Sequence, residues 1–122
     1  MKIAMIAHDN KKIEMLNFVR SFEDIIKKHE IVATGTTGSK LKDFVPDLNL
    51  TKVASGPYGG DAQIAALIEE KKIDAVFFFI DPLSAHPHDP DIHGLIRICV
   101  VYNIPLALNT ESGTHIVQNL LQ

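Results

Sequence analysis

The sequence is poor in several features that mark specialised classes of protein. Its 122 residues include one cysteine, Cys99, so no disulfide can form within the chain. A lone cysteine is also typical of a reducing compartment. Tryptophan is absent, and acidic residues outnumber basic ones, which gives a formal net charge of −3. That charge provides no broad field for a polyanion such as a nucleic acid, so a site for an anion must be a local arrangement.

Long apolar segments are also missing. The most apolar stretch, Ala75–Ile80, is far shorter than the roughly 20 residues with which a helix crosses a bilayer. The apolar opening, Met1–Ala7, is interrupted by His8 and Asp9 and is too short for a signal peptide. With no targeting segment or membrane span in view, we expect a cytoplasmic protein that has neither membrane nor nucleic acid as a partner.

Length and composition fit one globular domain. Hydrophobic residues make up 46% of the chain and charged residues 22%, which is ordinary for a folded protein. A chain of this size can bury one substantial core but not two. We therefore predict a single domain over residues 1–122.

The apolar pattern predicts alternating strands and helices. Continuous apolar runs predict strands at 3–7, 31–34, 50–54, 73–80 and 104–108. Apolar residues at helical spacing predict helices at about 11–28, 39–44, 62–72, 89–103 and 111–121. This alternation indicates an α/β fold, a doubly wound five-stranded parallel sheet with helices on both faces.

Polar, turn-forming clusters follow four of the predicted strands. They are His8–Lys12, Thr34–Gly38, Ser55–Asp61 and Asp81–Asp91. Doubly wound sheets bind ligands beyond the carboxyl ends of their strands. The clusters therefore predict a functional site at that edge of the sheet.

The cluster Thr34–Gly38 has three hydroxyls and two glycines between a predicted strand and a predicted helix. Hydroxyls and free amides at a helix start can hold a phosphate. The cluster matches neither the P-loop nor the dinucleotide fingerprint, so we expect no nucleotide cofactor. Lys12 falls one turn after His8 and could neutralise the phosphate, while Ser55 and Gly56 offer a hydroxyl and an amide. The alternatives are a turn capped by a threonine and a solvated lysine.

The glycine-rich turn Ser55–Asp61 brings a carboxylate to the start of a predicted helix. Aspartate is a favoured helix N-cap. In a binding site it is also a common general base. Asp61 is thus either a cap or a catalytic base.

The stretch His86–His93 contains three histidines, which suggests a metal. We favour another interpretation, because zinc sites need ligands that converge from fixed spacings. A histidine at a helix start stays neutral and can donate a hydrogen bond to a carbonyl oxygen. His88 is the candidate for that role, and Asp91 or Asp81 could fix its tautomer. A phosphate cradle, a base and a donor suit a small phosphorylated ketone that loses a proton beside its carbonyl.

The motifs at the four strand ends resemble those of the methylglyoxal synthase family. They read Ala7-His8-Asp9, Ala33-Thr34-Gly35-Thr36-Thr37-Gly38, Ser55-Gly56-Pro57 with Gly59-Gly60-Asp61, and Asp81-Pro82-Leu83 with Pro87-His88-Asp89-Pro90-Asp91. They span nearly the whole chain in the same order as in the family. The resemblance implies a lyase that converts dihydroxyacetone phosphate to methylglyoxal and inorganic phosphate, without cofactor or metal.

The resemblance also implies roles for individual residues. Asp61 would be the base, and His88 and Asp91 would complete the catalytic set. The substrate would be held by His8, Lys12, Thr34, Gly35, Thr36, Thr37, Ser55, Gly56, Asp81 and His88. Family members form homo-oligomers, commonly hexamers, and are inhibited by phosphate. The resemblance therefore implies that this chain has further copies of itself and inorganic phosphate as partners.

Two other functions are compatible with this fold. Non-catalytic modules of the same superfamily, such as the regulatory domain of carbamoyl phosphate synthetase and part of the purine cyclohydrolase, bind anions. The set of Asp61, His88 and Asp91 disfavours such a module, which does not need a base. A flavodoxin-like electron carrier is also disfavoured, because these acidic residues do not suit a negatively charged flavin.

Overall fold

Five parallel strands form one sheet in the computed structural model, which describes residues 1–55, 58–83 and 89–122. The order across the sheet is β3-β2-β1-β4-β5. The strands are β1 (Lys2–Ala7), β2 (Glu30–Thr34), β3 (Asn49–Val53), β4 (Ala75–Phe79) and β5 (Leu106–Ala107). The predicted fold class is confirmed. β4, which we expected at the centre, is interior, and β1 is the middle strand.

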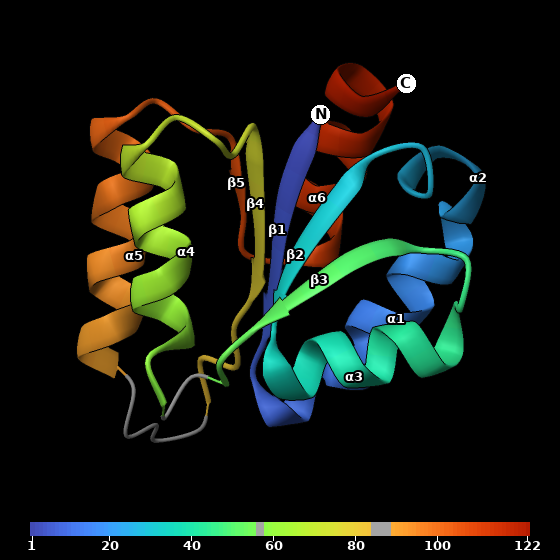
Figure 1. Cartoon of the computed structure of the whole chain (residues 1–122), viewed down its shortest axis with the longest axis horizontal. Helices are drawn as coiled ribbons and strands as arrows, with labels where there is room; N and C mark the ends of the chain where they lie inside the picture. Colours follow the sequence, from blue (N-terminus) through green and yellow to red (C-terminus); the bar gives the residue numbers. More distant parts are fainter. Residues whose placement is uncertain (56–57, 84–88) are drawn as a thin grey trace.

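Helices cover both faces of the sheet (Figure 1). One face carries α4 (Gly60–Glu69) and α5 (Asp89–Val101). The other carries the remaining helices, namely η1 (Asp9–Lys11), α1 (Lys12–Ser21), α2 (Glu23–Ile26), α3 (Gly35–Phe44), α6 (Thr110–Ile116) and the π-helical turn η3 (Val117–Leu121).

The alternation of side chains along β1 and β4 divides the core into two layers. Met5 and Phe77 face α1 and α6, while Ile6 and Phe78 face α4 and α5. All four side chains are buried, because successive residues of a strand point to opposite faces. Burial on both faces explains why these strands are continuously apolar in the sequence.

Four predicted elements differ in their extent. The helix predicted at about 11–28 is broken at Phe22 (φ −116°, ψ 25°) into α1 and α2. The helix predicted from residue 39 begins at Gly35. The strand predicted at 104–108 is in regular β conformation only at Leu106 and Ala107, although Pro105 and Leu108 also accept backbone hydrogen bonds from Val76 and Ile80. The last helix, predicted as continuous, changes to π-helical hydrogen bonding at Val117. Apolar periodicity does not report such changes, because each segment keeps its buried stripe.

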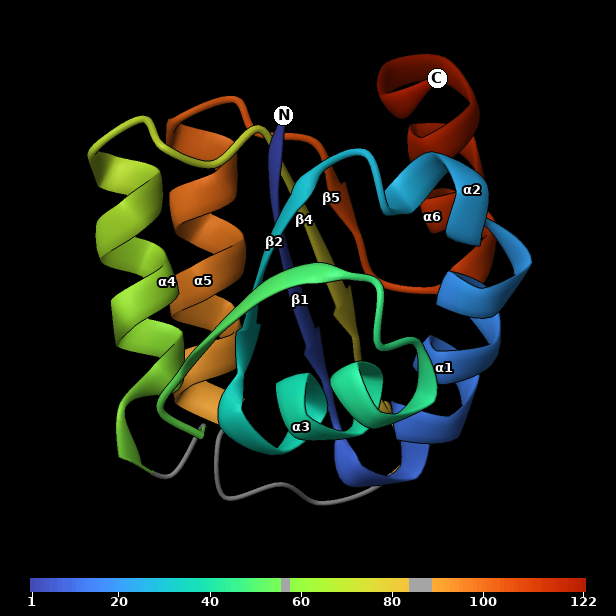
Figure 2. The same ribbon diagram turned by 45° about the vertical axis from the view of Figure 1, so that its right-hand side comes forward.

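Parallel pairing brings the carboxyl ends of the strands to one edge of the sheet. Figure 2 shows η1, the start of α3 and the start of α4 along this edge. No helix among the described residues is long and apolar enough to cross a membrane.

Two helical glycines test how tightly the helices pack. In Gly113→Ala, the added Cβ would lie 2.9 Å from Phe18 Cζ and 3.4 Å from Phe77 Cδ1. We expect a loss of about 1–3 kcal/mol in the free energy of unfolding, as for other overpacked cores. Gly94→Ala is the matched control, because no atom lies within 4 Å of its Cβ. There alanine should stabilise the helix by about 0.5–1 kcal/mol. Urea unfolding of both variants measures the difference, and equal effects would contradict the described packing.

Candidate active site

The predicted site residues gather at the carboxyl edge of the sheet. His8 follows β1, Thr34 ends β2, and Ser55 and Asp81 lie just beyond β3 and β4. Lys12 begins α1, and Asp61 is in the first turn of α4. Gly56 and His88 lie outside the described residues, and Asp91 is described only as part of the α5 backbone.

His8 is fixed between β1 and β4. Its backbone N–H donates to the carbonyl of Phe79 (3.1 Å), and its ring Nδ1 accepts from the backbone N–H of Asp81 (2.9 Å). The buried ring also meets the edge of Phe78, with centroids 5.4 Å apart. Because Nδ1 is an acceptor, the neutral ring carries its proton on Nε2. His8 is therefore set to donate a hydrogen bond through Nε2.

The Asp81 carboxylate has two described hydrogen-bond donors. The Asn10 side-chain amide donates to Oδ2 (2.9 Å), and the backbone N–H of Leu83 donates to Oδ1 (3.0 Å). These bonds, the Asn10 bond foremost, lower the pKa of Asp81, and the positive charge of Lys11 adds to the effect. Asn10 is not among the predicted site residues, because its side chain meets Asp81 only after β1 and β4 pair.

Lys12 is a buried lysine, so the interpretation as a solvated surface residue is wrong. Its side chain is 9% exposed, and Nζ donates to the carbonyl of Ala7 and to Asp9 Oδ1, both at 2.9 Å. An ammonium has three donors. Two hold Lys12 against the end of β1, and one is left for a ligand.

The cluster Thr34–Gly38 is a helix N-terminus and not a turn before a helix. α3 begins at Gly35, and the side chain of Thr34, at the N-cap position, makes no capping hydrogen bond. The interpretation as a threonine cap is therefore wrong. The first amides of an α-helix have no partner within the helix. The Gly35 N–H donates to the carbonyl of Ala54 (3.3 Å). Thr36 and Thr37 follow in the first turn, whose N–H groups have no acceptor within the helix.

Thr37 provides a second sign of a ligand at this helix end. It is 2% exposed, and its Oγ1 has no hydrogen-bond partner within the part of the chain that the structure describes. A buried hydroxyl without a partner is costly, since it has lost its hydrogen bonds to water. An anion at the N-terminus of α3 would supply the missing acceptor.

Close approach of backbones joins α4 to the strand ends. A Cβ on Gly60 would lie 1.9 Å from the carbonyl oxygen of Ala54, so only glycine fits. The carbonyl of Ser55 accepts from the N–H groups of Tyr58 (2.9 Å) and Gly60 (3.1 Å). Gly59, with φ +92°, occupies the N-cap position, and Asp61 is the second residue of α4. Asp61 is thus not the N-cap, and its half-buried carboxylate lies in the first turn.

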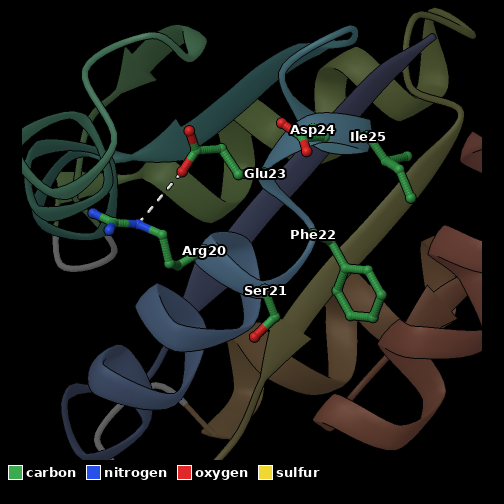
Figure 3. A pocket seen from close by; sticks show the side chains of 6 residues that line it. All are labelled: Arg20, Ser21, Phe22, Glu23, Asp24 and Ile25. Carbon is green, nitrogen blue, oxygen red and sulfur yellow. Dashed lines mark ion pairs between the residues drawn. The ribbon is translucent and has the colours of Figure 1, made fainter.

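A surface hollow of about 520 Å³ unites three predicted residues, Gly35, Thr36 and Ser55. Another hollow, of about 390 Å³, lies at the junction of α1 and α2 (Figure 3). It contains no predicted site residue, and its Arg20 pairs with Glu23 at 3.4 Å. Among the described residues, no three histidine, cysteine or acidic side chains are grouped so as to hold a metal ion.

Comparison with known proteins agrees with this arrangement. The model of the MGS-like domain matches residues 14–108. Methylglyoxal synthase of Rhizobium etli is 47% identical over 118 residues, which cover 97% of this chain and 94% of the relative. That of Brucella ovis is 48% identical over 120 residues, covering 98% and 96%. The chain belongs to the methylglyoxal synthase family.

A solved member of the methylglyoxal synthase family has the same fold. The crystal structure of the enzyme from Elizabethkingia anophelis superposes with a TM-score of 0.92 at 39% identity. The match covers 98% of this chain and 78% of that one. The predictions of a methylglyoxal synthase and of a lyase are confirmed by these relatives, which support neither a non-catalytic module nor an electron carrier.

The pKa of Asp81 tests the geometry at this edge. Asn10→Ala removes the hydrogen bond that lowers it most, so the pKa should rise towards its ordinary value of 3.8. Because the pKa of Asp81 is lower in the folded state than in the unfolded state, ionised Asp81 stabilises the fold at any pH above the unfolded-state pKa. This stabilisation is lost as the pH falls through the folded-state pKa. The variant should therefore lose less stability on acidification than the parent. NMR titration of the carboxyl carbon measures the pKa, with Asn17→Ala in α1 as control, and an unchanged value in Asn10→Ala would refute the described contact.

Proposed function

We propose that the chain removes a proton from dihydroxyacetone phosphate and then eliminates its phosphate, releasing methylglyoxal and inorganic phosphate. The observation that carries this proposal is the meeting, at one sheet edge, of a helix N-terminus, a buried lysine and a carboxylate. These groups are the start of α3, Lys12 and Asp61. Family membership supports the same reaction.

The phosphate group would bind at the N-terminus of α3. The amides of Thr36 and Thr37 and the unpartnered hydroxyl of Thr37 supply hydrogen-bond donors. The remaining N–H of Lys12 adds a charge-assisted bond. The dipole of α3 favours the negative charge. Ser55, Thr34, Gly35 and Gly56 complete the proposed binding set.

Asp61 would act as the base. It takes a proton from the hydroxymethyl carbon, and the electrons of that C–H bond form an enediolate with negative charge on the former carbonyl oxygen. His88 would donate a hydrogen bond to this oxygen, with its tautomer set by Asp91. His8, whose neutral ring donates through Nε2, would line the same substrate, as would Asp81. Such donors act where charge develops in the transition state.

The enediolate then expels phosphate from the neighbouring carbon. As the C–O bond breaks, the hydroxyl of the deprotonated carbon gives its proton to the leaving phosphate and becomes the aldehyde, and the carbon–carbon double bond moves to the carbon that carried the phosphate. The resulting enolate takes back on that carbon the proton that Asp61 removed, which gives methylglyoxal and restores the carboxylate. Loss of phosphate requires the C–O bond to stand out of the enediolate plane. The angle at which the α3 N-terminus holds the phosphate would therefore decide between elimination and isomerisation. The binding set needs no cofactor or metal for this chemistry.

Several broader properties belong to the same proposal. The two layers of the core lie on opposite faces of one shared sheet, which supports a single domain over residues 1–122. We infer a homo-oligomer, commonly a hexamer in the family, and inhibition by phosphate, which would occupy the site of the leaving group. The lone, buried Cys99 is consistent with the reducing cytoplasm.

The role of Asp61 is tested by Asp61→Asn. Asparagine has nearly the same shape but cannot accept the proton, so turnover should fall by about 10²–10⁴-fold. The free energy of unfolding should change by less than about 1 kcal/mol, because asparagine keeps nearly the same shape and the charge that is removed lies in the first turn of α4. Phosphate affinity should stay equal or increase. The measurements are release of methylglyoxal and phosphate, calorimetric phosphate binding and melting temperature.

Asp24→Asn is the matched control for Asp61. Asp24 is an exposed aspartate on α2 whose carboxylate lies 3.4 Å from Lys27 Nζ. This variant should keep full turnover. Near-normal release from Asp61→Asn would exclude Asp61 as the base, and the absence of turnover in the unchanged protein would overturn the proposed reaction.

The role of Lys12 is tested by Lys12→Met, which keeps the apolar stem and removes the charge. A charge-assisted hydrogen bond is worth about 1.5–3 kcal/mol, so phosphate and substrate should bind about ten- to a hundred-fold more weakly. Lys27→Met is the control, because this exposed ammonium at the end of α2 pairs with Asp24 (3.4 Å) and belongs to no part of the proposed site. Equal phosphate affinity in the two variants would show that Lys12 serves only the fold.

A further inference from the structure

One surface hollow carries only positive charge. It is the hollow of about 520 Å³ between the start of α3 and the end of β3, and eight residues line it. Three of them, Gly35, Thr36 and Ser55, belong to the proposed phosphate site. Its charged residues are Lys40 and Lys52.

Two other hollows have the opposite character. The hollow at the α1–α2 junction (Figure 3) is lined by Arg20, Glu23 and Asp24 among others, which leaves one net negative charge. The hollow between α1 and α6 has Glu14 as its charged residue. In a chain of net charge −3, a hollow whose described lining has two lysines and no acid is a local feature of the α3 end.

The structure directs Lys52 towards this end. Its stem lies on α3, since a Cβ on Gly38 would be 2.7 Å from Lys52 Cγ and 3.3 Å from Cδ. Its Nζ donates to Ser39 Oγ at 3.2 Å. Gly38 leaves the space for the stem and Ser39 holds the ammonium, so the charge stays beside the first turns of α3.

We propose that Lys52 is a positioning residue that draws the phosphate dianion of the substrate into the N-terminus of α3. This inference rests on the proposed function of that helix end. Lys52 remains exposed at the rim, unlike the buried Lys12, so its ammonium acts through solvent on a dianion that approaches. Such a charge raises the local concentration of the ligand and speeds its capture, and salt weakens the effect.

A lysine on an edge strand also has a purely structural explanation. β3 is at the edge of the sheet, and exposed lysines there discourage pairing with strands of other molecules. That role involves no ligand. It predicts no change in substrate KM and no dependence of KM on salt, so the two explanations differ in measurable quantities.

The test is Lys52→Met, with Lys52→Arg and Lys28→Met beside it. Methionine keeps a similar stem, and arginine keeps the charge. Lys28 is an exposed lysine just before β2, so its loss removes the same charge at the opposite edge of the sheet. At low salt, Lys52→Met should raise KM and the Kd of inorganic phosphate about three- to ten-fold, the size expected for one charge acting on a dianion through water. Its kcat and melting temperature should not change.

Salt and the companion variants decide the interpretation. In about 0.5 M salt the difference between Lys52→Met and the parent should disappear, because a Debye length of a few ångströms screens the charge. Lys52→Arg and Lys28→Met should both stay within two-fold of the parent. A KM and phosphate Kd unchanged in Lys52→Met at low salt, a loss that persists in salt, or a loss confined to kcat would each overturn the proposal.

The phosphate measurement separates this inference from the proposed function. If the parent protein binds phosphate and releases methylglyoxal while Lys52→Met behaves identically, only the role of Lys52 is refuted. If the parent releases no methylglyoxal, the proposed function is refuted, and a salt-sensitive loss of phosphate affinity in Lys52→Met would still support the electrostatic role.

Discussion

A parallel sheet has to bury both of its faces, and the rest of this structure depends on that requirement. β1 and β4 lie in the interior of the sheet and are apolar on both sides, so helices must cover each face. Parallel strands can be joined only by crossover connections. Each crossover leaves its strand at the carboxyl end, and in a parallel sheet all of these ends lie at one edge. The carboxyl ends of the strands therefore meet there, and the loops after them are free to carry polar groups.

The polar groups at this edge are held by backbone geometry more than by one another. His8 is oriented by the N–H of Asp81, and Lys12 by the carbonyl of Ala7. The N-termini of α3 and α4 come close to the end of β3 because Gly35 and Gly60, respectively, have no side chains in the way. A site built on strand ends and helix starts is rigid, as an enzyme needs if it is to hold one substrate geometry. The hydroxyl of Thr37, which has no hydrogen-bond partner among the described residues, lies where we propose that an anion binds.

Residue types alone indicated which strand ends carry the candidate site. Glycine and threonine after a strand indicate an anion site at a helix start. This prediction does not depend on the residue at which the helix begins. The predicted boundary was nevertheless wrong, since α3 begins at Gly35 and not at Ser39. Threonine and glycine are poor helix formers. They were therefore assigned to a turn, whereas packing against β3 makes them helical. Asp61 was similarly placed at a helix start, but its distinction from an N-cap required the conformation of Gly59.

The sequence by itself determined the fold class and the sheet edge at which the candidate residues gather, because apolar periodicity and turn residues are local signals. Only the tertiary structure decided which groups touch. Asn10 meets Asp81 across the β1–β4 pair, Asp9 and Ala7 hold Lys12, and Lys52 lies over Gly38. The contacts of Asn10 and Lys52 join residues distant in the chain, and the ion pair of Lys12 joins a buried ammonium to an exposed carboxylate three residues away. Their geometry follows from strand pairing and side-chain packing, which the periodicity of one segment does not contain.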